Sequence, residues 1–138
     1  MSAPITIILA GEPRGKGRPR FGNGRSYMDA KTQHYEAALR IAAMDAMGAR
    51  RPIEGPVVVN IEARVPVPAS WSQKKRQSAL SGEVRPTTKP DIDNIVKTWD
   101  ALNHVVFNDD RQIVEAAVRK VYHEKPALII TVKEVGVE

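Results

Sequence analysis

The sequence predicts an α+β fold, with a small mixed β-sheet flanked by helices. Runs rich in β-branched residues lie near both ends of the chain and in its middle, and helical segments separate them. The 138 residues, of which 42% are hydrophobic and 27% charged, suit a single domain over residues 1–138 with one core. The predicted order is strand, basic loop, helix, strand, two helices and two strands.

The first predicted strand leads into a basic loop. Residues 4–11, PITIILAG, are rich in β-branched residues and end at a glycine. We predict a loop over residues 11–27, because the stretch GEPRGKGRPRFGNGR at 11–25 contains five glycines and two prolines. The same stretch carries five basic side chains against the single acidic residue Glu12.

A helix, a strand and a second helix are predicted next. Residues 29–47 are alanine-rich with apolar residues at helical spacing, which indicates an amphipathic helix. Residues 55–68 alternate between apolar and polar side chains, as a half-buried strand does. Residues 70–82 are expected to form a short basic helix capped by Ser70. The predicted buried positions of the first two elements are Tyr35, Ala38, Leu39, Ala42, Ala43, Ala46, Val57, Val59, Ile61 and Ala63.

The C-terminal third contains one further helix and two strands. Residues 91–103 are predicted to be helical, followed by a turn or short extended piece at 104–110. The runs 111–124 and 126–135 are rich in β-branched residues, and we expect them to pair as a hairpin around Pro126. The core stripe expected for the helix is Ile92, Ile95, Val96, Trp99 and Leu102.

Composition narrows the classes of function. There is no cysteine, which excludes disulfides and thiolate zinc sites and agrees with a cytoplasmic location. No apolar run approaches the ~20 residues of a membrane span, and the N-terminus lacks the charge order of a secretory signal. The net charge of +5 favours nucleic acid as a partner. Serine nucleophile elbows, phosphate-binding loops and dinucleotide fingerprints are absent from the sequence.

Two aspartates stand at the start of the 91–103 helix. Asp91 and Asp93 are two residues apart, and Lys97 follows Asp93 by four residues on the face opposite the apolar stripe. In one interpretation Asp91 caps the helix and Asp93 pairs with Lys97, which is an ordinary solvated helix start. In the other interpretation the two carboxylates hold a cation.

A second acidic pair, Asp109 and Asp110, lies in the turn before the next strand. Alone it has an ordinary turn composition. If the turn approaches the helix start, three or four carboxylates converge, and such a cluster needs a neutralising cation. Mg²⁺ prefers oxygen ligands, and two such ions can clamp a phosphodiester. Lys97 would then place a positive charge beside the phosphate.

The basic loop supplies candidate contacts to a phosphate backbone. Loss of a phosphate contact lowers the affinity for DNA and the dependence of that affinity on salt concentration. Glycines let a loop lie close to DNA. Phe21 can stack on bases or pack under the loop. The alternative to phosphate contact by the basic residues is that the loop is solvated and mobile. A metal-dependent nuclease is the simplest function that uses both the loop and the carboxylates. The candidate DNA-binding residues are Arg14, Lys16, Arg18 and Arg20.

The string KPDIDNIVKTWDALN at 89–103, followed by FNDDRQI at 107–113, closely resembles the signature of the RusA family of Holliday junction resolvases, especially its phage-type members. The stretch GEPRGKGRPRF at 11–21 resembles the basic loop that those members carry after their first strand. The resemblance covers most of the chain in order and spacing. Where the family often has glycine after DALN, this chain has His104.

The resemblance implies a function and a set of site residues. Asp91, Asp93 and Asp110 would be catalytic and bind Mg²⁺, for which Mn²⁺ can substitute, and Lys97 would be the essential lysine. A homodimer would nick two opposed strands of a four-way DNA junction, in recombination and repair. The residues leave open a non-catalytic protein that binds branched nucleic acid, and a structural protein whose aspartates only cap and turn. Asp109 is either a turn former or a further ligand.

Overall fold

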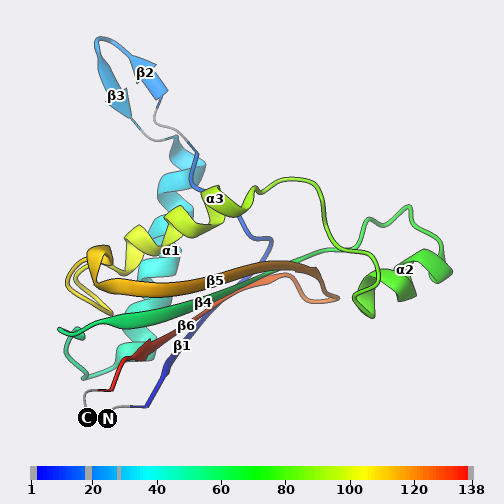
Figure 1. The fold of residues 1–138 in the computed structure, drawn as a ribbon. Coiled ribbons are helices and arrows are strands. Elements are labelled where there is room, and N and C mark those ends of the chain that lie inside the picture. The colour runs from blue at the N-terminus through cyan, green and yellow to red at the C-terminus, as the bar shows by residue number, and fades with distance from the viewer. Residues whose placement is uncertain (1–2, 18–19, 28, 137–138) are drawn as a thin grey trace.

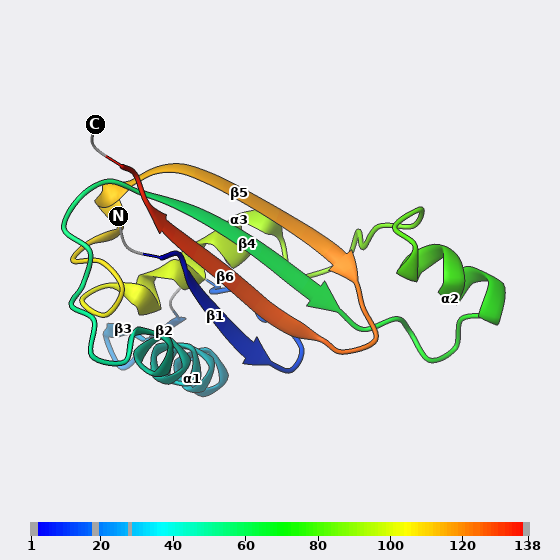
Figure 2. The ribbon, with the colours of Figure 1, turned by 90° about the horizontal axis from the view of Figure 1, so that it is seen from below.

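A mixed four-stranded sheet forms the centre of the computed structural model, which describes residues 3–17, 20–27 and 29–136. The strands are β1 (Ile5–Ala10), β4 (Val57–Val65), β5 (Ile113–Tyr122) and β6 (Ala127–Glu134), in the order β1-β6-β4-β5. β6 is antiparallel to both neighbours, and β4 and β5 are parallel. The described helices α1 and α3 lie on one face of this sheet, as the two views in Figures 1 and 2 show. The predicted α+β class is confirmed.

The central strand β4 explains why the core lies on that face. Its residues alternate in burial, with Val57, Val59, Ile61 and Ala63 all at most 1% exposed. This alternation follows from the period of two in a strand, which sends successive side chains to opposite faces. The half-buried strand predicted over 55–68 is therefore confirmed, with its expected buried positions.

The expected hairpin between the last two strands is wrong. β5 and β6 do not pair, because β4 lies between them and pairs with both. The connection at 123–126 therefore crosses the end of β4, where the His123 backbone N–H donates to the Val65 carbonyl at 3.0 Å. Sequence proximity suggested pairing, but β4 offers a buried hydrogen-bonding edge to each strand.

Helix α1 (Ala30–Met47) covers the β1 side of the sheet. It begins at its N-cap Asp29, whose side chain accepts from the Thr32 backbone N–H at 2.7 Å. Leu39 and Ala43 are buried as predicted, whereas Ala46 is exposed. Within the described residues, no helix has both the length and the hydrophobicity of a membrane span.

Helix α2 (Gln73–Leu80) stands off one end of the sheet (Figure 1). The predicted cap Ser70 is wrong: the cap is Ser72, whose side chain accepts from the Lys75 backbone N–H at 3.2 Å. The helix begins two residues later than expected, so the second serine of the Ser-Trp-Ser sequence occupies the capping position.

The segment predicted as one helix over 91–103 is split in two. Helix α3 (Ile92–Val96) passes into the 3-10 helix η1 (Lys97–Leu102). Ile92 was expected in the core and is 44% exposed, so that assignment is wrong. A 3-10 helix has three residues per turn, which shifts burial toward positions three apart. The buried residues are Ile95, Thr98, Ala101 and Leu102.

The basic segment is not entirely a loop. Strands β2 (Arg20–Gly22) and β3 (Arg25–Tyr27) form an antiparallel hairpin that extends away from the sheet (Figure 1). Asn23 and Gly24 turn the chain with φ of 51° and 77°, the backbone that Asn-Gly favours in tight hairpins. The prediction of an irregular loop over 11–27 is wrong for this part, and the Asn-Gly pair was the signal that it missed.

Candidate active site

Asp91 and Asp93 present exposed carboxylates at the start of α3. Asp91 occupies the N-cap position, but its side chain makes no capping hydrogen bond. In the part of the chain that the structure describes, no ion pair joins Asp93 to Lys97, which is itself exposed at the start of η1. Asp91 stands at the N-cap and Asp93 in the first turn, as the ordinary helix-start interpretation expects, but within the described residues the capping hydrogen bond and the i,i+4 ion pair are absent. The three charged groups therefore remain available to a ligand.

Asp109 is a turn former. It caps η2 (Asp110–Gln112), a single 3-10 turn, and its carboxylate accepts from the Arg111 backbone N–H at 2.9 Å. The side-chain oxygen of Gln112 accepts in return from the Asp109 backbone N–H at 2.9 Å, which completes a capping box. The hydrogen bond from the Arg111 N–H lowers the pKa of Asp109. This network fixes the turn that presents Asp110.

Asp110 meets a carboxylate that the sequence analysis did not select, that of Asp100 in η1. A hydrogen bond with Asp100, then partial burial and the charge of Asp100, raise the pKa of Asp110 to about 6. Two carboxyl groups in contact cannot both ionise freely, so one holds its proton more tightly. Asp100 had a detectable signal: it lies seven residues after Asp93, which places the two on one helical face.

Lys16 supplies a positive charge to the same cluster. Its ammonium group lies 3.1 Å from Asp100 Oδ2 and 2.9 Å from Glu36 Oε1 of α1. Burial lowers the pKa of Lys16, but the hydrogen bonds to Glu36 and Asp100 outweigh it and the net shift is upward. We define the acidic cluster as Glu36, Asp100 and Asp110, with Lys16 as its internal cation. Lys16 was expected to bind phosphate, but its ammonium group is paired here with the carboxylates of Glu36 and Asp100.

The basic segment is docked onto α3. The Lys16 backbone N–H donates to the Asn94 carbonyl at 2.9 Å. Gly15 packs so closely that a Cβ atom on it would lie 2.6 Å from Asn94 Cβ and 3.2 Å from Pro90 Cβ. Only glycine allows this approach, because real Cβ contacts are longer. Residues 14–16 therefore have a fixed position beside the helix that carries Asp91 and Asp93.

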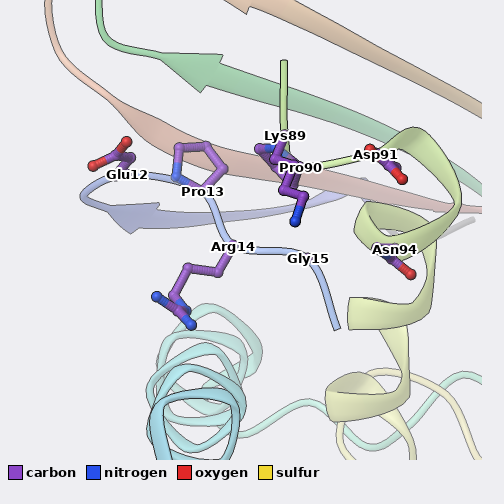
Figure 3. Close-up of a pocket in the computed structure, with 8 residues that line it drawn as sticks. All are labelled: Glu12, Pro13, Arg14, Gly15, Lys89, Pro90, Asp91 and Asn94. Atoms are coloured by element: carbon purple, nitrogen blue, oxygen red, sulfur yellow. The ribbon is translucent and has the colours of Figure 1, made fainter. Parts of the chain in front are cut away.

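A cleft of about 460 Å³ lies between the docked segment and α3, and we call it the loop–helix cleft (Figure 3). In Figure 3 the Lys89 side chain points toward the Arg14–Gly15 stretch, whereas the Arg14 guanidinium points toward α1. Asp91 is part of the lining, so the cleft opens beside the candidate catalytic carboxylates. Its lining residues are Glu12, Pro13, Arg14, Gly15, Lys89, Pro90, Asp91 and Asn94.

The structure describes the other predicted DNA-binding residues to different extents. Arg14 is exposed at the cleft. Arg18 lies outside the described residues, and of Arg20 only the backbone, in β2, is described. Phe21 is 83% exposed, so the interpretation that it packs under the loop does not hold.

The donor set suits a hard divalent cation, although the described residues do not group it into a metal site. Asp91, Asp93, Asp100 and Asp110 all offer carboxylate oxygens, the ligands that Mg²⁺ prefers. Asp110 contacts Asp100, and this contact raises the pKa of Asp110 because two neighbouring negative charges repel each other. Among residues 3–17, 20–27 and 29–136, no three His, Asp or Glu side chains are arranged to hold one ion.

The backbone at His104 supports the expected turn. His104 has φ of 68°, in the left-handed region that glycine enters most easily. Its backbone N–H donates to the Phe107 carbonyl at 2.7 Å, and Phe107 is fully buried. The chain therefore keeps a glycine-like turn here with a histidine side chain, and this turn leads into Asp109 and Asp110.

Comparison with known proteins identifies the family. The family model described as "Endodeoxyribonuclease RusA" matches residues 10–133, which include the docked segment, α3 and η2. A Bacillus subtilis (strain 168) protein with the description "Uncharacterized protein YqaN" is 39% identical over 142 aligned residues, which cover 96% of this chain and 97% of that protein. The chain therefore belongs to the RusA family of endodeoxyribonucleases.

Proposed function

We propose that the protein is a Mg²⁺-dependent endodeoxyribonuclease that resolves Holliday junctions by paired, symmetric nicks in DNA recombination and repair. Membership of the RusA family supports a nuclease that acts on branched DNA. The proposed catalytic residues are Asp91, Asp93, Asp110 and Lys97, and Asp100 joins them as a further carboxylate.

One observation carries the proposal: the contact between Asp110 and Asp100. It brings an acid from a turn to the same helical segment that bears Asp91 and Asp93 at its other end. This contact supports an acidic surface along residues 91–102, with Asp110 at the end opposite Asp91 and Asp93. A structural protein has no use for two carboxylates in contact, because they repel each other unless a proton or a cation lies between them.

The chemistry follows from these side chains. Asp91, Asp93 and Asp110 would hold the divalent ion, which would supply Lewis-acid activation of water and charge neutralisation on the phosphate. Lys97, exposed on the same helical segment, would stabilise the extra negative charge that develops on phosphorus. Arg14 is exposed beside the cleft with its guanidinium directed toward α1, and it would hold the DNA backbone on that side of the cleft.

A homodimer supplies the second cut. One set of these residues can cleave one strand, whereas a two-fold symmetric junction needs two opposed cuts. We therefore propose that two chains act together, in the cytoplasm, on the two strands of one junction. Sedimentation of the purified protein with and without junction DNA tests this, with a mass of two chains as the expected result.

A nicking assay tests the proposed function. A synthetic four-way junction, labelled on each strand in turn, should be cut in Mg²⁺ at paired positions on two opposed strands. Linear duplex and flap substrates are the controls, and both should remain uncut under the same conditions. Equal cutting of linear duplex, or no cutting of the junction at any divalent metal concentration, would contradict the proposal.

The alternative is a non-catalytic protein that binds branched nucleic acid. It is favoured by one observation, the lack of a three-acid metal site within the described ranges. The two functions differ in their response to metal, because a binding protein forms the complex in Mg²⁺ and in EDTA alike and cuts in neither. Intact strands after prolonged incubation with Mg²⁺ would favour this alternative.

A further inference from the structure

We propose that the loop–helix cleft receives one unpaired nucleotide of the DNA strand next to the cleaved bond. The inference rests on the proposed function, since it takes branched DNA as the substrate. It adds a basis for substrate choice, because a base next to a branch point unpairs at a lower cost than a base within an intact duplex.

The size of the cleft supports a nucleotide. Its volume of about 460 Å³ lies within the ~300–1,000 Å³ typical of pockets that enclose a small ligand. A duplex backbone lies along a protein surface and needs no such hollow. A base that has left its stack needs a pocket of its own, as in enzymes that act on flipped bases.

The walls of the cleft combine the groups that a nucleotide requires. Pro90 is half-buried and offers apolar surface to the face of a base, whereas Pro13 is buried beneath the lining of the cleft. Lys89 is exposed and points into the space between the two segments, where its ammonium group can meet a phosphate (Figure 3). Glu12 and Asn94 add polar atoms that can hydrogen-bond the edge of a base.

The position of the cleft ties it to the reaction. Asp91 belongs both to its lining and to the proposed catalytic residues. A strand whose phosphate lies at Asp91 must therefore place a neighbouring nucleotide in the cleft or across its mouth. Unpairing costs least where stacking is already interrupted, as at a branch point, so the cleft would favour junctions over linear DNA.

The cleft is built before DNA arrives. The close contact of Gly15 with Asn94 and the hydrogen bond from the Lys16 N–H to the Asn94 carbonyl fix its two walls relative to each other. A pre-formed pocket loses little conformational entropy when it is filled. This rigidity suits a site that tests the shape of its substrate.

Fluorescence of 2-aminopurine tests the inference without cleavage. The base analogue is placed at each position in turn within three nucleotides of the branch point, and the junction is titrated with the wild-type protein in EDTA. The expected result is a severalfold rise in fluorescence at one or two adjacent positions, because the base leaves its stack. If the junction binds and no position responds, the inference is wrong while the proposed function stands. If the protein does not bind the junction, the proposed function fails and the inference falls with it.

Two substitutions at the exposed residue Lys89 separate its charge from the space it borders. Lys89→Gln removes the phosphate contact, so junction affinity should fall about threefold to tenfold and the salt slope by about one, while the fluorescence rise at saturation persists. Lys89→Trp also fills the cleft and should abolish the rise and reduce the preference for junction over duplex. Lys74→Gln on α2, an equally exposed lysine, is the control and should change none of these. A full fluorescence rise with Lys89→Trp would overturn the inference.

Discussion

Two pairs of aspartates lie at opposite ends of the 91–102 segment, and they differ in their surroundings. At the start of α3, Asp91 and Asp93 are exposed and make no capping bond or ion pair in the described part of the chain. At the far end, Asp100 contacts Asp110 and is paired with Lys16. Among the residues that the structure describes, the first pair has no internal partner, and the second is held within a network of charges.

This difference separates two contributions of acidic residues. A carboxylate with internal partners helps to set the shape of the site, so its loss should affect stability, pH response and loop position. A carboxylate without partners contributes little to folding, so its loss should affect chemistry alone. Substitutions at the two ends therefore test this difference. The largest expected effect is on nicking, and smaller effects are expected on stability and on its dependence on pH.

The largest effect is expected at the unpartnered end. Asp93→Asn should reduce junction nicking by at least about a hundredfold, because it removes a negative metal ligand while the side-chain shape is retained. Junction binding and the melting temperature should stay close to those of the wild type, and Asp91→Asn should behave in the same way. Single-turnover nicking and thermal melts provide both readouts.

A matched control is Asp45→Asn, which removes an exposed carboxylate from α1. It should leave nicking and stability unchanged. If Asp93→Asn still cut at the wild-type rate, Asp93 would not be a catalytic residue, and the difference between the two ends of the segment would have no consequence for cleavage.

Local sequence patterns were sufficient for much of the fold and for the exposed pair. The alternation in β4 and the β-branched runs of β1, β5 and β6 predicted four strands, because strand period is a local property. The proline, the two aspartates and the following helix could likewise be read directly from adjacent residues. The pairing of the strands could not be predicted in this way. β5 and β6 would show the same local pattern whether they paired with each other or lay on either side of β4.

The partnered end depends on contacts between distant residues. Lys16 and Asp100 are 84 residues apart, and a sequence pattern shows only that one is in a basic stretch and the other in a helix. The same holds for Gly15, whose need for glycine arises from Asn94 and Pro90 rather than from its neighbours. The sequence thus predicted that loop and carboxylates work together, but not that they are in direct contact.

The next effect in size is expected where the basic segment meets α3. Gly15→Ala places a Cβ atom 2.6 Å from Asn94 Cβ, so the segment must move away from the helix. Overpacking of this kind costs about 1–3 kcal/mol, and the free energy of unfolding should fall by that order. Chemical denaturation measures the loss, and junction binding should weaken with it.

Gly17→Ala is the control, because a Cβ atom at Gly17 meets nothing within 4 Å. It should leave stability within about 0.5 kcal/mol of the wild type, as most surface substitutions do. Equal losses in the two variants would mean that flexibility of the basic segment matters, rather than its docking on α3.

A smaller effect is expected from the internal cation. Lys16→Met keeps the apolar stem but leaves Glu36 and Asp100 without their shared ammonium group. The pairs are partly exposed, so the free energy of unfolding should fall by about 1 kcal/mol. Lys31→Met at an exposed position of α1 is the control and should have little effect.

The salt dependence of junction binding distinguishes the two roles of Lys16. If Lys16 serves the acidic cluster, the slope of log affinity against log salt should stay the same in Lys16→Met. A slope reduced by about one would show that Lys16 leaves the carboxylates and contacts a phosphate in the complex. That result would support the original expectation for Lys16 and would make its pairing a feature of the free protein.

The smallest effect is a pH dependence at the partnered end. The pKa of Asp110 is raised to about 6, from an ordinary value of 3.8, chiefly by its hydrogen bond with Asp100, so the folded state holds a proton that the unfolded chain releases. This stabilisation is complete below about pH 3.8 and is lost as the pH rises through 6. Solvent screening of a partly exposed pair keeps the change below about 1 kcal/mol.

Asp100→Asn removes the second carboxylate and should flatten this dependence. Urea denaturation between pH 4 and pH 7 in EDTA should show the wild type losing stability relative to Asp100→Asn as the pH rises. The Asp110 carboxyl resonance should titrate near its ordinary pKa in the variant. Parallel stability curves for the two proteins would mean that Asp100 and Asp110 do not share a proton, and the two ends of the segment would then differ in exposure alone.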